Sequence, residues 1–335
     1  MHLQVYIDTN VYLNLLGSQA VVPEGLAKFR ALCENASIQV LLPQQTEEEY
    51  LSNREDVIAS TIEALRAAKS IGGLPPLIET HSEGETARSL RRKLAATDQG
   101  ISEWYAEAAS CHALPMDEWF AAIKKASVRI PSTPELRAKA AQRAASHLPP
   151  GKGEALGDRL IWEALLSESG FCDDIHIITK DGKDYRSPLK PDEARKSLQV
   201  EWEDVNWGKV HIYESIDDFL STVSETPEFT RAAEIGRAIW VLNNQSEEES
   251  INSACGTVTR YIQQISSFQA TKIGKGLKVY YDRVFLTSDT FDALLPEFYR
   301  LYAKHIDEKD RNALSAILAA AGVVRDALQN VANNN

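Results

Sequence analysis

Short apolar runs, each closed by a polar residue or a proline, recur through the first two thirds of the chain and predict β-strands. Apolar residues at spacings of three and four lie between these runs and predict helices. A chain in which strands alternate with helices is typical of a mostly parallel sheet with helices on both faces. The predicted fold class is therefore α/β. The predicted strands are residues 3–7, 38–43, 175–179 and 210–213.

One long helical block interrupts this alternation. From about residue 55 to about residue 150 the apolar spacing stays helical, and Thr133 followed by Pro134 marks a helix start within the block. Strand signals resume after it. We therefore interpret the block as a large helical insertion in one α/β domain that spans residues 1–225.

The last third of the chain has a mainly helical pattern from Pro227 onward and is predicted to form a second domain, residues 226–335. One strand is expected within it, at Lys278–Leu286. Small residues at Ala319–Gly322 would let the last helix pack closely against a neighbour. We therefore expect a homo-oligomer that forms through the C-terminal helices.

The composition is that of a globular protein in a reducing compartment. Of the 335 residues 44% are hydrophobic and 25% are charged, and the four cysteines form no C-x-x-C pair. No apolar run reaches the roughly 18–20 residues that a membrane span needs, and no signal segment is apparent, so we expect a cytoplasmic protein without a membrane partner. The formal charge of −12 argues against general nucleic-acid coating. It does not argue against an enzyme whose carboxylates bind cations that meet phosphate.

Acidic residues recur where a predicted strand ends or a predicted helix begins. In a parallel sheet these positions share one edge, so their carboxylates are expected to lie together. Several carboxylates in one place stay ionised only if a cation compensates their charge, and oxygen ligands without His or Cys favour Mg²⁺ or Mn²⁺. Two such ions roughly 3.5–4 Å apart would suit hydrolysis of a phosphodiester. The acids are Asp8, Glu49, Asp158, Asp181 and Asp184.

Each acid also has an ordinary structural interpretation, which is weakest for Asp8, because Thr9 or Asn10 could cap the following helix in its place. Glu49 follows Thr46 at the spacing of a capping box, and Asp158 would be stabilised by the positive end of its helix. Asp181 precedes Gly182 in a turn signal, and Asp184 could be a solvated charge. No single acid is diagnostic, and the order of the acids along the chain is the stronger signal.

That order resembles the PIN-domain nuclease family, in particular its bacterial PIN-like subgroup with a large insertion. The motifs are a strand ending in Asp8-Thr9-Asn10, Leu-Pro-x5-Glu ending at Glu49, Gly-Asp at Asp158, and Ile-Ile-Thr-x-Asp-x-x-Asp over residues 177–184. The resemblance covers residues 3–54 and 156–223. It implies that Asp8, Glu49, Asp158 and Asp181 are catalytic ligands of Mg²⁺ or Mn²⁺, with Asp184 as a frequent fifth ligand, and that the substrate is RNA.

Polar and basic residues near these acids are candidates for supporting roles. Thr9, Asn10 and Thr179 can donate hydrogen bonds to the carboxylates or to a bound water. The nearby cations could contact phosphates, although a solvated loop position is the simpler interpretation for each of them. Trp104, Trp119 and Trp162 could stack on bases, but their helical spacing favours core positions. The candidate cations are Lys152, Arg159, Lys180 and Lys183.

Two other functions remain open. A haloacid-dehalogenase-type phosphatase also begins with a strand and an Asp, but it needs Asp-x-Asp, and Asn10 stands where the second Asp would be. A scaffold that binds RNA or a partner protein with little catalysis would fit the C-terminal helices. Within the nuclease interpretation, a DNA substrate remains an alternative to RNA.

The biological role follows only from the resemblance. It suggests a toxin or an anti-phage defence effector, held silent by an antitoxin or another regulatory protein. We expect the insertion and the C-terminal region to select a structured RNA such as tRNA, or to receive a regulatory signal.

Overall fold

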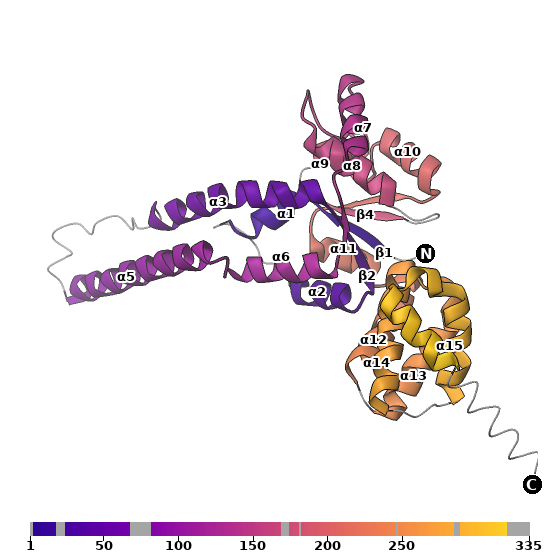
Figure 1. Cartoon of the computed structure of the whole chain (residues 1–335). Coiled ribbons are helices and arrows are strands. Elements are labelled where there is room, and N and C mark those ends of the chain that lie inside the picture. The colour runs from indigo at the N-terminus through magenta and orange to yellow at the C-terminus, as the bar shows by residue number, and fades with distance from the viewer. Residues whose placement is uncertain are drawn as a thin grey trace, which may run out of the picture.

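A computed structural model shows a five-stranded parallel sheet at the centre of the N-terminal part of the protein (Figure 1). The strand order is β3-β2-β1-β4-β5, so the chain leaves β1 in one direction and returns to its other side at β4. The structure describes residues 3–17, 24–67, 82–168, 174–180, 182–245, 247–284 and 289–319. The strands are β1 (Leu3–Ile7), β2 (Ile38–Pro43), β3 (Val128–Ile130), β4 (Ile175–Ile178) and β5 (Val210–Tyr213).

The α/β prediction is confirmed, with one strand that the sequence did not reveal. β3 lies inside the block interpreted as helical, where it pairs with Leu41–Pro43 of β2 and forms one edge of the sheet. Three residues between two helices are too few to show a period of two. The inserted block therefore also extends the sheet.

Successive residues of the strands point to opposite faces and build two separate apolar cores. Val5 packs with α1 (Thr9–Asn14), α2 (Leu26–Glu34) and α11 (Ile216–Val223), whereas Tyr6 packs on the other face. The helices of that second face are α7 (Pro134–Ala145), α8 (Gly157–Glu168) and α10 (Lys196–Asn206). Helix α10 was not predicted, although Leu198 and Trp202 are fully buried in this core.

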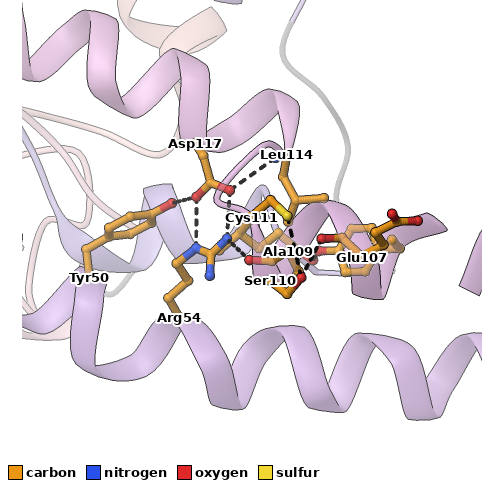
Figure 2. Close-up of polar contacts among 10 residues, drawn as sticks. Tyr50, Arg54, Glu107, Ala109, Ser110, Cys111, Leu114 and Asp117 are labelled. Carbon is orange, nitrogen blue, oxygen red and sulfur yellow. Dashed lines mark hydrogen bonds and ion pairs between the residues drawn. The ribbon is translucent and has the colours of Figure 1, made fainter. Parts of the chain in front are cut away.

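Helices α3 (Gln44–Ala67) and α5 (Ser82–Ser110) run side by side away from the sheet and form a long arm (Figure 1). Helix α6 (Pro115–Ala126) leads the chain back to β3. A buried ion pair fastens the base of the arm. Arg54 on α3 donates from Nε to Oδ1 of Asp117 at 2.8 Å and from Nη2 to Oδ2 at 2.7 Å (Figure 2). Arg54 Nη2 also reaches the carbonyl of Ala109, so α3, α5 and α6 meet at one guanidinium.

The C-terminal helices build a third core. It is formed almost entirely by residues 235–317, and among the described residues of the N-terminal part only Ala36 is a buried member of it. Helix α12 spans the boundary between the cores, because Phe229 packs with the first core and Ile235 with the third. The elements are α12 (Pro227–Asn244), α13 (Glu248–Arg260), η1 (Ile262–Gln264), α14 (Ser267–Val284), α15 (Asp289–Tyr302) and η2 (Ala303–His305).

The strand predicted at Lys278–Leu286 is wrong. Residues 278–284 belong to α14, because Ile273 and Leu277 sit at helical spacing and are fully buried in the C-terminal core. Within the described segments, no helix has the length and apolar character to cross a bilayer.

Replacing Arg54 by Met should destabilise the protein by about 3–5 kcal/mol, because Asp117 would stay buried without its cation. The free energy of unfolding from urea titration checks this. Arg30→Met is the matched control, since the Arg30–Glu34 pair is about half exposed and should contribute about 0.5 kcal/mol or less. Equal losses in the two variants would contradict the prediction.

His176 should make the protein less stable as the pH falls. Burial, and then the neighbouring His211, lower the pKa of His176 to about 3. Below the ordinary histidine pKa of about 6.5, His176 therefore binds a proton in the unfolded chain but stays neutral in the folded chain. This costs about 2 kcal/mol of stability at pH 5 relative to pH 7.

The variant His176→Gln, which retains a partner for the Tyr213 hydroxyl 3.0 Å away, should flatten the pH dependence of the unfolding free energy between pH 5 and pH 7. His305→Gln, at an exposed position in the C-terminal part of the chain, is the control. A slope in His176→Gln equal to that of the wild type would show that His176 does not contribute.

Candidate active site at the carboxyl edge of the sheet

Asp8 directly follows β1, at the point where the chain connections diverge to the two sides of the sheet. Its backbone N–H donates to the Ile178 carbonyl of β4 at 2.9 Å, so β1 and β4 are still paired where the side chain begins. Ligand crevices of open parallel sheets lie at this position, outside the carboxyl ends of the diverging strands. Asp8 is nearly buried there, with 7% of the residue exposed.

Two neighbouring side chains fix the carboxylate of Asp8. Thr179, which follows β4, donates from Oγ1 to Asp8 Oδ2 at 2.5 Å, and Asn10 donates from Nδ2 to the same oxygen at 2.7 Å. The Asn10 carbonyl oxygen in turn accepts from the backbone N–H of Lys180 at 3.1 Å. The structure thus places Thr179 and Asn10 beside the acid, within hydrogen-bonding distance of one of its oxygens.

Glu49 lies in the second turn of α3 and points toward the same place. Thr9 donates from Oγ1 to Glu49 Oε2 at 3.0 Å, and Gln45 donates from Nε2 to Oε1 at 2.9 Å. Helix α3 begins at Gln44, two residues before Thr46, so Glu49 does not close a capping box with Thr46. Its position instead turns the carboxylate into the site.

Gly157 makes room for this carboxylate. A Cβ atom built on Gly157 would lie 2.4 Å from Glu49 Oε1, so any side chain there would push Glu49 away. Because Gly157 is also the first residue of α8, the approach brings Glu49 next to the helix turn that carries Asp158.

Four of the five predicted acids line one cavity of about 200 Å³. They come from four separate segments of the chain, which only the folded sheet brings together. Asn53 of α3 and Leu13 of α1 complete part of the wall. Asp181, the fifth predicted acid, lies outside the described residues. The four acids are Asp8, Glu49, Asp158 and Asp184.

Tyr185 also lines the cavity and was missed by the sequence reasoning. Tyr185 is buried, with 2% of the residue exposed, and its hydroxyl has no hydrogen-bond partner among the described residues. Burial, and then the charges of Asp8, Asp158 and Asp184, raise the pKa of Tyr185 well above its ordinary value. The phenol therefore stays protonated and remains available as a donor. Its position directly after Asp184 was the only signal in the sequence.

The predicted cations differ in their surroundings. Lys152 Nζ lies 3.8 Å from Asp184 Oδ1 while its side chain is largely exposed, and Lys180 and Lys183 are exposed as well. Arg159, in contrast, is buried and donates to the backbone carbonyls of Leu148, Gly151 and Ala155. It therefore holds the loop that precedes α8, and this differs from the expected contact with phosphate.

Two of the three tryptophans considered as base-stacking residues are core residues. Trp119 belongs to the core beneath α6, and Trp162 to the core beneath α8. Trp104 is 54% exposed on α5, away from the acids.

The residues of the cavity fit a divalent cation by the chemistry of their donors. Carboxylates and a buried hydroxyl are oxygen ligands of the kind that Mg²⁺ and Mn²⁺ prefer, and neither His nor Cys lines the cavity. In the described part of the chain, no three His, Cys, Asp or Glu side chains are already grouped so that they could hold a metal ion. The fit therefore rests on the donor set and on the shared cavity.

Comparison with known proteins gives one match. A family model described as a PIN domain matches residues 5–185, just over half of the chain. The match includes β1 to β4, the arm and all four acids of the cavity, and it ends before β5 and the C-terminal helices. No curated protein and no solved structure was found to match the chain.

Replacing Gly157 by Ala should displace the Glu49 carboxylate and weaken binding of Mn²⁺ by about tenfold or more. The stability should change little, because the displaced atom is the end of a flexible side chain. Calorimetric titration with Mn²⁺ and thermal unfolding check this. Gly256→Ala in α13 is the matched control, because nothing lies within 4 Å of a Cβ at that position. Unchanged Mn²⁺ affinity in Gly157→Ala would separate Glu49 from metal binding.

Proposed function

The chain belongs to the PIN-domain family, whose members are generally metal-dependent nucleases, and on that premise we propose that it is a metal-dependent endoribonuclease. The observation that carries this proposal is the cavity at the carboxyl edge of the sheet. Asp8, Glu49, Asp158 and Asp184 converge on it from four segments of the chain. A structural role would not require four acids in one place, because their mutual repulsion is unfavourable.

These four residues would hold Mg²⁺ or Mn²⁺, with Asp181 as a further ligand. A bound divalent ion supplies Lewis-acid stabilisation of the negative charge that develops on a phosphodiester as it is hydrolysed. The protein itself fixes the carboxylates. Thr179 and Asn10 orient Asp8, and hydrogen bonds from Thr9 and Gln45 hold both oxygens of Glu49. Hydrogen bonds that fix the ligand carboxylates in this way give a metal site a defined geometry.

Two further side chains would act on the substrate. Tyr185 keeps its proton because burial and the neighbouring acids raise its pKa, so its hydroxyl would donate to an oxygen bound in the cavity. Lys152 stands beside Asp184 with an exposed side chain and would contact a phosphate next to the one cleaved. Lys180, which lies after β4, and Lys183, in the short helix α9 (Gly182–Tyr185), are exposed as well and would extend this contact.

We propose RNA as the substrate because RNA is the usual substrate of the family that the four motifs resemble. The net charge of −12 disfavours sequence-independent affinity, so the substrate would be selected by shape, as in a structured RNA such as tRNA. A nuclease with such selectivity would suit a toxin or an anti-phage effector that an antitoxin or another regulatory protein controls.

We further propose that residues 226–335 form a separate regulatory or substrate-selecting domain. Their own apolar core, formed almost entirely by residues 235–317, supports this division. Helix α12 would join the two domains rigidly, since its first turns pack with the N-terminal core.

Asp8→Asn should abolish cleavage, lowering the rate by about 10³-fold or more, because it removes a charged ligand while keeping the shape of the side chain. Labelled RNA, single-stranded DNA and duplex DNA would each be incubated with Mg²⁺, Mn²⁺ or EDTA. We expect RNA to be cut only with metal. Asp204→Asn, an exposed acid on α10, is the control and should cut at the wild-type rate.

Other outcomes would redirect the proposal. Cutting of DNA alone would keep the site and change the substrate. Release of phosphate from a monoester would favour phosphatase chemistry at Asp8. Mn²⁺ binding without cutting of any substrate would require an activator or a more specific RNA. Absence of both metal binding and cutting would leave a scaffold.

A further inference from the structure

Helix α5 carries a row of large apolar side chains on its exposed surface. Leu90, Leu94, Ile101 and Trp104 are each between 47% and 61% exposed. Single apolar residues on a surface are ordinary, but these four lie on one helix of an arm that extends away from the sheet (Figure 1). Together with Thr97, which is also exposed, we call them the α5 stripe.

The α5 stripe has the spacing of a coiled-coil seam. Its five residues follow one another at intervals of four, three, four and three, which places them on one face of a helix at the a and d positions of a heptad. The face that α5 turns toward the rest of the molecule is a different one. Among the α5 side chains that the structure describes, Ser102 and Ala109 are buried, roughly a quarter turn away from the stripe, and Tyr105 and Ala108 pack partly against the first core. The four large apolar residues of the stripe are therefore additional to the packing of α5 within the chain.

The stripe is self-complementary when two α5 helices run antiparallel. In antiparallel coiled coils an a position meets a d position of the partner. This register sets Leu94 opposite Trp104 of a second copy, and Thr97 opposite Ile101. Leu90 then faces Ala108, a small residue that is only partly exposed because it also packs against the first core. Each pair occurs twice because a two-fold axis relates the helices, so all the exposed apolar residues of the stripe are covered.

The charges beside the stripe match the same register. Lys93 and Glu107 are both exposed and lie on the flank of the stripe that faces away from the buried side of α5. At the flanking g positions of an antiparallel pair, Lys93 meets Glu107 of the second copy, again twice. Within one chain the two residues are 14 positions apart, about 21 Å along the helix, and do not reach each other.

We propose that the protein forms a two-fold symmetric dimer in which the α5 stripes of two copies pack antiparallel. This surface differs from the oligomer contact expected through the C-terminal helices. Most of Ala319–Gly322, the small residues behind that expectation, lie outside the described residues. The α5 stripe has both the apolar spacing and the charge order that a second copy of the same helix would match.

Sedimentation equilibrium of the full chain tests the apolar seam. At about 100 μM, enough to populate even a weak complex, we expect the mass of a dimer. The double variant Leu94→Glu/Ile101→Glu should weaken the dimer by about 100-fold or more and sediment as a folded monomer. Leu189→Glu is the control, because Leu189 is 91% exposed outside the arm and should leave the dimer intact.

A charge-swap experiment tests the register. Lys93→Glu and Glu107→Lys should each weaken the dimer by about tenfold, because each places two like-charge pairs at the interface. The double variant Lys93→Glu/Glu107→Lys should restore wild-type association. Since the two residues do not meet within one chain, a restored dimer can arise only from contact between copies.

Three results would overturn the dimer. One is a monomeric wild type at about 100 μM. Another is a dimer whose mass the stripe variants do not change, which would place the contact elsewhere. The third is a monomer whose affinity for RNA falls in Leu94→Glu/Ile101→Glu, which would make the stripe a nucleic-acid surface.

Discussion

Repulsion among carboxylates is the constraint on which the site depends. Four acids line a cavity of about 200 Å³, and their charges also act on the buried phenol of Tyr185. In the structure this repulsion is offset by directed hydrogen bonds to Asp8 and Glu49 and by Lys152 at one edge. The parallel sheet makes the arrangement unavoidable, because it delivers the end of every strand to the same edge.

The sequence revealed the parts of this site that topology determines. Asp8 and Thr179 each follow a strand with a clear apolar pattern, so their shared edge could be predicted from the order of elements. Gln45, Gly157 and Tyr185 could not be predicted, because their roles arise from contacts between segments distant in the chain. Thr46 shows that a local pattern can also mislead. It has the local spacing of a cap, but the helix begins two residues earlier.

Burial explains the remaining differences between expectation and structure. An arginine next to an acid in the sequence suggests phosphate binding, yet Arg159 is buried and donates hydrogen bonds to backbone carbonyls. No local sequence pattern indicates this burial. β3 is too short to show a periodic pattern. The end of α14 was predicted to be a strand because valines and tyrosines, which are common in strands, are interspersed there with charged residues. The long periodic elements were the ones that could be predicted, since their pattern repeats over several turns.

Helix α3 runs without a break from the site into the arm. Glu49 stands about 7.5 Å along the helix on one side of Arg54, and the described end of α3 lies about 20 Å on the other. The buried Arg54–Asp117 pair holds α3 at Arg54, and the shorter part of the helix beyond this point carries the Glu49 carboxylate. If α3 tilted about this pair as a straight rod, a displacement of about 3 Å at the far end would become about 1 Å at Glu49, a misplacement large enough to change a reaction rate by about 100-fold. A contact made at the far end of the arm would then act on the site through the position of one carboxylate.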